Sequence, residues 1–163
     1  MIHYAESRKE TDIMPDEKSV EGSVHPELKL ENQLCFPLYA CARRVVNLYE
    51  PYFKPLGITY TQYIVFLVLW EKESVCVGEL SKKLFLDSGT LTPLLKKLEK
   101  EGYVERRRSE DDERKVIVSL TEKGRELEAF AADIPQKVGS CVNLSPEESY
   151  TLYMLLYKII NNI

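Results

Sequence analysis

Apolar residues recur every three or four positions along most of this 163-residue chain, a spacing that places them on one face of a helix. The pattern predicts helices over residues 28–48, 59–73, 77–84, 88–101, 121–142 and 145–163. The fifth helix contains Pro135, which bends or breaks it. The last one starts with Ser145, Pro146 and Glu148, a sequence typical of a capped helix start.

The first predicted helix contains Pro37, which lacks a backbone donor and collides with the carbonyl four residues earlier. The helix therefore either begins near residues 32–34, with Pro37 close to its first turn, or kinks at the proline. Both alternatives leave free backbone amides near Cys35. Three residues that end helices close this segment: Pro51, Pro55 and Gly57.

The fold class follows from the middle of the chain. The helices at 77–84 and 88–101 lie three or four residues apart, which is helix-turn-helix spacing. After Gly102 the apolar period changes to two, which predicts a β-hairpin over 103–120 with a charged turn at 110–114. A helix-turn-helix followed by a hairpin is a winged helix. We therefore predict a mainly α (α+β) chain: a winged helix-turn-helix with N- and C-terminal dimerisation helices.

Four segments make up the predicted organisation. Residues 1–27 are polar and form a flexible arm, and residues 28–163 form a single domain. Within that domain, 59–120 is the DNA-binding lobe, whereas 28–58 and 121–163 supply dimerisation helices. The last helix carries more apolar residues than one winged helix can cover, so we expect a homodimer to bury them. These residues are Leu152, Leu155, Leu156, Ile159, Ile160 and Ile163.

The net charge of −4 argues against nucleic acid until its distribution is considered. Residues 1–27 hold three bases and seven acids, which account for the whole −4, so the rest of the chain is neutral. The neutral part contains a basic cluster at 106–108, followed by Arg114 and Lys115. Double-stranded DNA is therefore the expected partner.

Candidate DNA contacts lie first on the helix at 88–101. It starts with small hydroxyl side chains that approach base edges and phosphates, and two lysines follow one turn later for the backbone. These residues are Ser88, Thr90, Thr92, Lys96 and Lys97. For any one hydroxyl, helix capping is an equally good interpretation.

The predicted hairpin supplies the second set of DNA contacts. Arg106 and Arg108 share one face of a strand, whereas Arg107 points to the other. At the tip, Asp112 is expected to orient Arg114 through a bidentate pair for entry into a minor groove. The alternative is a solvated turn with a surface ion pair worth about 0–1 kcal/mol.

Cys35 is the candidate for thiol chemistry. It lies at a predicted helix start, and Tyr39, Tyr49 and Tyr60 follow in the same stretch of sequence. Helix amides and phenol hydroxyls stabilise a thiolate, which a peroxide oxidises to a sulfenic acid. The alternative is a small buried side chain on the inner face of a helix, which is our interpretation of Cys41.

Other functional classes find little support in the sequence. The four cysteines form no C-x-x-C pair and both histidines lie in the N-terminal arm, so we expect neither a zinc site nor a cofactor. No run approaches the roughly 20 apolar residues of a membrane span, and the N-terminus lacks a signal-peptide layout. We therefore expect a cytoplasmic protein with free thiols and no membrane partner.

Several motifs resemble the MarR family of winged-helix regulators, and within it the organic hydroperoxide-sensing repressors (OhrR type). They are LENQLCFPLYA, LGITYTQYIVFLVLWE, LFLDSGTLTPLLKKLEKEGYVERRRSEDDER and VSLTEKG. The resemblance covers about residues 28–163. It implies that Cys35 is the peroxidatic cysteine and that Tyr39, Tyr49 and Tyr60 are its hydrogen-bonding tyrosines. Two of these tyrosines would come from the partner subunit.

The resemblance also implies a homodimeric repressor that leaves a pseudo-palindromic operator when an organic hydroperoxide oxidises Cys35. The sulfenic acid would then be resolved by a low-molecular-weight thiol, which we favour, or by Cys141 of the partner chain. Two other functions stay open. One is a MarR-type sensor of small phenolic ligands with an inert Cys35. The other is a thiol peroxidase, against which the missing thioredoxin-like pattern argues, so we predict a protein that is not an enzyme.

Overall fold

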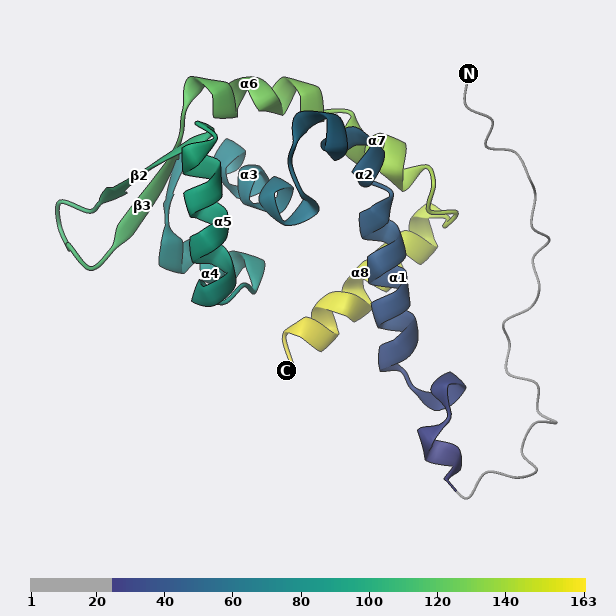
Figure 1. Ribbon diagram of the computed structural model, residues 1–163. Coiled ribbons are helices and arrows are strands. Elements are labelled where there is room, and N and C mark those ends of the chain that lie inside the picture. Colours follow the sequence, from purple (N-terminus) through teal and green to yellow (C-terminus); the bar gives the residue numbers. More distant parts are fainter. Residues whose placement is uncertain (1–24) are drawn as a thin grey trace. The chain divides into compact units, whose positions relative to one another are not determined.

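The computed structural model describes residues 25–163 (Figure 1). They form two compact units, the first ending at Arg43 and the second running from Arg44 to Ile163. Most of the predicted flexible arm, residues 1–24, lies outside the described residues. Its last residues enter a 3-10 turn, η1, at Pro26–Leu28.

The N-terminal unit leads into the first helix through two short turns. After η1, a second 3-10 turn, η2, spans Leu30–Asn32, and α1 runs over Cys35–Asn47. Pro37 is thus the third residue of α1, where its missing donor has no intrahelical acceptor to lose. Of the two alternatives for Pro37, the one that puts it in the first turn is confirmed, with the start at Cys35 rather than at residues 32–34.

The second unit begins with the end of α1 and a sharp change of direction. The short helix α2 spans Glu50–Phe53 and a 3-10 turn, η3, spans Lys54–Leu56. Gly57 ends this segment in the left-handed region, at φ 69°. The central helix α3 covers Tyr60–Lys72, and its start is fixed by a capping box in which Thr59 and Gln62 each accept a hydrogen bond from the other's backbone amide.

The middle part of the second unit's sequence forms the winged helix, and its hairpin projects away from the helices (Figure 1). Helices α4 at Val77–Leu84 and α5 at Ser88–Lys100 form the helix-turn-helix, and β2 at Val104–Arg108 with β3 at Val116–Leu120 form the hairpin. A third strand, β1 at Ser74–Cys76, was not predicted. It pairs with the other edge of β3, so the antiparallel sheet has the order β1-β3-β2.

Three helices follow the wing. α6 spans Glu122–Ala131 and α7 spans Ile134–Gly139, so the helical pattern over 121–142 is broken just before Pro135. α8 covers Pro146–Ile160 and starts with the predicted capping box of Ser145 and Glu148. Within residues 25–163 no helix is both long and apolar enough to cross a membrane.

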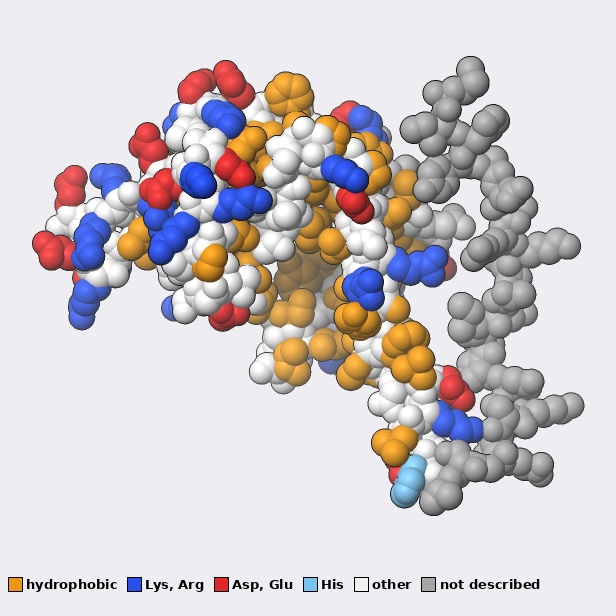
Figure 2. Space-filling view, in the orientation of Figure 1, with side chains coloured by type: hydrophobic (Ala, Val, Ile, Leu, Met, Phe, Trp, Pro, Cys, Tyr) orange, Lys and Arg blue, Asp and Glu red, His pale blue; other side chains and the backbone are white. Residues whose placement is uncertain are grey.

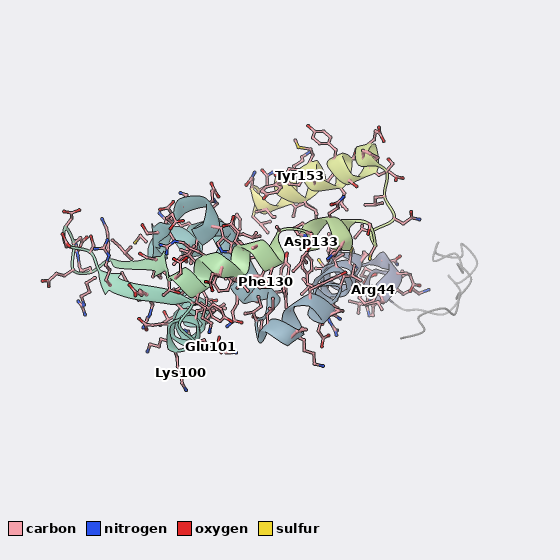
Figure 3. All side chains as sticks on the ribbon, turned by 90° about the horizontal axis from the view of Figure 1, so that it is seen from above. Arg44, Lys100, Glu101, Phe130, Asp133 and Tyr153 are labelled. Carbon is pink, nitrogen blue, oxygen red and sulfur yellow. The ribbon has the colours of Figure 1, made fainter. Side chains whose placement is uncertain are left out.

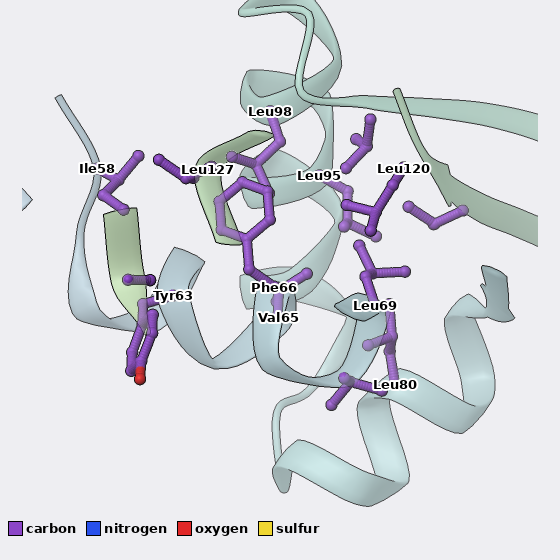
Figure 4. Packing of buried hydrophobic residues seen from close by; sticks show 14 of the residues in the cluster. Ile58, Tyr63, Val65, Phe66, Leu69, Leu80, Leu95, Leu98, Leu120 and Leu127 are labelled. Atoms are coloured by element: carbon purple, nitrogen blue, oxygen red, sulfur yellow. The ribbon is translucent and has the colours of Figure 1, made fainter. Parts of the chain in front are cut away.

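The hydrophobic core gathers around α3 (Figure 4). Phe66 and Leu69 of α3 are fully buried, and they share one cluster with Leu80 of α4 and Leu95 of α5. The hairpin contributes buried residues at its base, and α6 adds Leu127. The helix-turn-helix and the base of the wing are therefore held by one core rather than by separate contacts.

Gly124 marks the closest approach between α6 and the base of the hairpin. A Cβ atom at this position would lie 2.2 Å from the backbone oxygen of Tyr103 and 2.9 Å from the side chain of Leu120. The Gly124 carbonyl accepts a hydrogen bond of 3.0 Å from the indole Nε1 of Trp70. Only glycine lets α6 contact the hairpin and α3 at the same point.

We predict that Gly124→Ala destabilises the fold by about 2–3 kcal/mol, because the added methyl group pushes α6 away from the backbone of the hairpin in a packed region. Thermal unfolding followed by circular dichroism measures the change. Gly139→Ala in α7 is the matched control, since a Cβ there meets no atom within 4 Å. An unchanged melting temperature for Gly124→Ala would contradict the close approach.

Candidate nucleic-acid interface and thiol site

The start of α5 is organised by an acidic cap. Asp87 accepts hydrogen bonds of 2.9 Å from both the backbone amide and the hydroxyl of Thr90. These two bonds, with the amide as the larger cause, hold the pKa of Asp87 below its ordinary value. The cap is therefore Asp87 rather than Ser88, which leaves the exposed Ser88 hydroxyl available for an outside partner.

The other predicted α5 residues differ in how available they are. Thr92 is half-buried, whereas Lys96 and Lys97 are exposed. Lys97 lies 3.7 Å from the carboxylate of the half-buried Glu101, four residues further along the chain. Lys96 makes no ion pair within residues 25–163, so its ammonium group is the more available of the two for a phosphate.

The arginines of the hairpin are not equivalent. Arg106 donates two hydrogen bonds, of 2.9 and 2.6 Å, from its guanidinium to one carboxylate oxygen of Glu99 in α5. Arg108 instead bonds the backbone oxygen of Glu113 at 3.1 Å and is exposed. Arg106 therefore fastens the wing to α5, and only Arg108 of the predicted pair presents an exposed side chain.

The hairpin tip holds the predicted acid and arginine together. The Nε of Arg114 donates to Asp112 at 3.0 Å and its Nη2 donates to the other carboxylate oxygen at 3.4 Å. The Arg114 side chain is 91% exposed, whereas that of Asp112 is 22% exposed. The guanidinium bonds are the main cause of the lowered pKa of Asp112. The carboxylate thus stays charged and orients an arginine that projects into solvent.

A cavity of about 320 Å³ lies between the helix-turn-helix and the hairpin. Its lining comes from the start of α4, from Thr92 of α5 and from the cationic side chains of Arg106, Arg114 and Lys115. Figure 2 shows Lys and Arg side chains gathered over the hairpin and the helices beside it, with acidic side chains between them. This face therefore offers positive charge at the concave junction of helix and wing.

Cys35 occupies the first position of α1 and is exposed. Tyr39, one turn later, accepts a hydrogen bond of 3.2 Å on its hydroxyl from the Nη1 of Arg43, whose guanidinium lies 5.5 Å from the ring centre. Cys41 is exposed as well, although the sequence analysis interpreted it as a small buried side chain. Within one chain it is not buried. Thiol and phenol thus lie at the start of one helix.

Tyr49 and Tyr60 belong to an aromatic cluster of the second unit. Their ring centres are 4.9 Å apart, and both contact Tyr63. Burial is the main cause that raises the pKa values of all three tyrosines, so their phenols stay protonated and are able to donate hydrogen bonds. Tyr49 and Tyr60 also line a cavity of about 420 Å³ together with Phe53 and Ile58.

The predicted sensing residues are therefore distributed over both units. Cys35 and Tyr39 lie in the first, whereas Tyr49 and Tyr60 lie in the second. Their assembly around one thiol stays a prediction. Cys141 follows α7, is exposed, and lies 3.4 Å from the backbone oxygen of Lys137. All four cysteines are free thiols.

The chain is similar to known transcriptional regulators in both sequence and fold. Residues 47–129 match the family model described as the transcriptional regulators SarA/Rot. The organic hydroperoxide resistance transcriptional regulator of Bacillus subtilis is 46% identical over 136 residues, which are 83% of this chain and 92% of that protein. The chain belongs to the MarR/SarA family of winged-helix transcriptional regulators.

Two solved relatives of this MarR/SarA protein are bound to DNA. Reduced AbfR bound to DNA has a TM-score of 0.69 and 36% identity, over 82% of this chain and 93% of that one. AbfR is a protein of Staphylococcus epidermidis. A mutant of Escherichia coli MarR in complex with operator DNA has a TM-score of 0.70 and 29% identity, over 85% and 99% of the two chains.

AbfR has also been solved in two oxidised states. The overoxidized protein bound to DNA has a TM-score of 0.68 and 37% identity, over 82% of this chain and 95% of that one. The disulfide form has a TM-score of 0.58 and 39% identity, over 80% and 92%. The predicted winged helix-turn-helix class is confirmed, and the family contains regulators rather than enzymes.

Two features of this MarR/SarA wing escaped the sequence analysis. The pairing of Arg106 with Glu99 joins residues on different elements, and no local pattern predicts it. Arg107 also has an acidic neighbour, because its guanidinium lies 3.7 Å from the carboxylate of Glu110. For this second pair, the sequence signal was a run of arginines at 106–108 followed by acids at 110–113.

We predict that Asp112→Asn lowers the affinity for operator DNA about tenfold, because Arg114 loses the carboxylate that orients it. Fluorescence anisotropy at fixed salt measures the affinity. Charge alone would act in the opposite direction, since the substitution removes a negative group from a surface that faces phosphates. Glu110→Gln at the same tip is the matched control and should bind equally well or better. Tighter binding by Asp112→Asn would contradict the orienting role.

Proposed function

We propose that this regulator is a homodimeric repressor that binds a pseudo-palindromic operator and is released when an organic hydroperoxide oxidises Cys35. The observation that carries the proposal is the position of this thiol, at the first residue of α1 and exposed to solvent. The same segment belongs to a chain that closely resembles an organic hydroperoxide resistance regulator. In this proposal, oxidation of Cys35 controls whether the protein stays bound to its operator.

The apolar faces of α8 support the homodimer. Met154 is 50% exposed, Leu155 is 53% exposed, and Tyr153, labelled in Figure 3, is 55% exposed. α8 contains no buried residue within one chain. A helix with so much exposed apolar surface is stable in water only when another surface covers it. A second copy, with 28–58 and 121–163 as the dimerisation segments, provides that surface.

DNA binding follows from the placement of α5 and the hairpin on one core. In the proposed complex, α5 enters the major groove with the exposed Ser88, Thr90, Lys96 and Lys97 and the half-buried Thr92. Arg108 and the Asp112–Arg114 pair contact the flanking backbone and minor groove. Arg106 acts indirectly, because its bonds to Glu99 hold the wing against α5. Two copies related by a twofold axis read two half-sites.

The chemical step uses two external reactants. The Cys35 thiolate attacks the outer oxygen of an organic hydroperoxide, breaks the O–O bond and leaves a sulfenic acid and an alcohol after protonation. A low-molecular-weight thiol then attacks the sulfenic sulfur, forms a mixed disulfide and releases water. The proposed role of Tyr39, Tyr49 and Tyr60 is to donate hydrogen bonds to the thiolate, for which protonated phenols are suited.

In this proposal, oxidation of the Cys35 sulfur by oxygen atoms alone is not sufficient for release from DNA. The overoxidized form of AbfR is bound to DNA, whereas AbfR also exists with a disulfide. We therefore assign release in this chain to the disulfide step, which adds bulk beside Cys35 and removes hydrogen bonds to a charged group. Such a bond contributes about 1.5–3 kcal/mol, and a hundredfold loss of affinity corresponds to about 2.7 kcal/mol. One or two lost bonds are thus sufficient.

A second candidate function rests on the cavity beside Tyr49 and Tyr60. Its volume of about 420 Å³ and its aromatic lining fit a small phenolic ligand. In that case ligand binding releases the operator and Cys35 is inert. The two functions differ in whether release requires the thiol.

We predict that Cys35→Ser keeps operator affinity within about twofold of wild type and is no longer released by cumene hydroperoxide, because a hydroxyl does not form a sulfenic acid. The measurement is a gel shift on operator DNA, with and without the oxidant. Cys41→Ser is the matched control and should respond like wild type. Full release of Cys35→Ser would instead favour the phenolic sensor.

We predict that Cys141→Ser still releases operator DNA when hydroperoxide and a small thiol are added together, because the small thiol completes the disulfide. Mass spectrometry of the intact protein then shows one thiol adduct per chain, and fragment spectra place it on Cys35 rather than Cys41. A wild-type chain that forms a covalent dimer on a non-reducing gel, and a Cys141→Ser chain that does not, would instead establish Cys141 as the resolving thiol.

A further inference from the structure

Phe85 has an unusual backbone conformation for a bulky residue. It connects α4 to α5 and adopts φ 53° and ψ 37°, in the left-handed region. Glycine favours this region at the end of a helix, whereas a side chain with a Cβ atom is strained there. Its aromatic side chain is 69% exposed. The residue therefore carries strain without gaining burial in return.

The turn is held together by other groups. The backbone amides of Phe85 and Leu86 both donate to the carbonyl of Ser81, the latter at 3.1 Å. The hydroxyl of Ser81 donates in turn to the carbonyl of Leu86 at 2.6 Å. Leu86 also packs against the core. The fold thus needs the backbone of Phe85 but not its ring.

The ring lies next to the DNA-reading elements. Phe85 is two residues before Asp87, which caps α5, and three residues after Lys82, an exposed lysine in the last turn of α4. In a helix-turn-helix, the first turn of the second helix enters the major groove. A residue just outside that helix lies at the rim of the groove, where the sugar-phosphate backbone runs.

The chemistry of the ring restricts what it can contact at that rim. A phenyl group offers no charge for a phosphate and no donor or acceptor for a base edge. Deoxyribose carbons are the apolar surface that the backbone exposes between its phosphates. We propose that Phe85 packs against a deoxyribose at the edge of the major groove. This contact rests on the proposed DNA-binding function and extends its interface from α5 to the preceding turn.

Such a contact has two properties that separate it from the lysine contacts. It does not depend on base sequence, so its loss weakens operator and non-specific DNA by the same factor. It also releases no counterion, so the slope of log affinity against log salt stays unchanged. Loss of a phosphate contact such as that of Lys96 reduces this slope by about one.

The test uses a duplex that the wild-type protein selects from random sequences, and a scrambled duplex of equal length. Phe85→Gly should weaken binding to both duplexes about tenfold, a loss typical of removing a buried contact of an aromatic ring. The slope of log affinity against log salt should stay unchanged. Its melting temperature should equal or exceed that of wild type, because glycine relieves the strain. Phe85→Asn, which also tolerates the left-handed region, should lose the same affinity. Phe85→Tyr should retain it.

Two controls complete the experiment. Leu67→Ala removes another exposed apolar side chain, 44% exposed on α3 and outside the proposed DNA contacts and dimerisation segments, and should leave the affinity unchanged. Lys96→Ala should change the salt slope.

Wild-type affinity in both Phe85→Gly and Phe85→Asn would overturn the contact. So would a loss that disappears when deoxyuridine replaces thymidine, because the ring would then contact a thymine methyl group. If the wild-type protein enriches no duplex at all, the proposed DNA-binding function fails first.

Discussion

The joint at the base of the wing is the constraint on which the rest of the structure depends. Here α6, the hairpin and α3 meet at Gly124, where no side chain fits between α6 and the carbonyl of Tyr103. Thr121 reinforces the joint, because its hydroxyl donates to the carbonyl of Gly102 at 2.7 Å and accepts from the amide of Gly124. The indole of Trp70 connects the same point to α3. The hairpin therefore leaves the core in a fixed direction.

Because the base of the wing is fixed, the position of each arginine in the hairpin is fixed as well. The hairpin is not a simple cationic arm, since Arg106, Arg107 and Arg114 each have a carboxylate within 4 Å. The Glu99 pair acts within the fold, whereas the Asp112 pair orients an exposed guanidinium at the tip. The neutral charge of residues 28–163 is thus compatible with DNA binding, because position and orientation of the arginines replace excess charge.

The proposed thiol switch and the reading surface lie in different parts of the chain, so a signal between them must pass through packing. Cys35 starts a helix that has exposed apolar side chains, as α8 does, and in the proposed dimer a second copy covers them. In the proposed dimer, the spacing of the two reading surfaces depends on how these helices pack. In the proposed mechanism, a covalent adduct at Cys35 alters that packing without contacting the DNA.

The sequence by itself determined the features that arise from local interactions. The helices, the capping boxes at Thr59 and Ser145, the hairpin and the Asp112–Arg114 pair all follow from residues within a few positions of one another. Tertiary structure alone decided the short strand β1, the use of Arg106 inside the fold, the close approach at Gly124 and the strained, exposed Phe85. Each of these depends on groups brought together from distant positions or on a backbone angle that the alternation of apolar and polar residues does not specify.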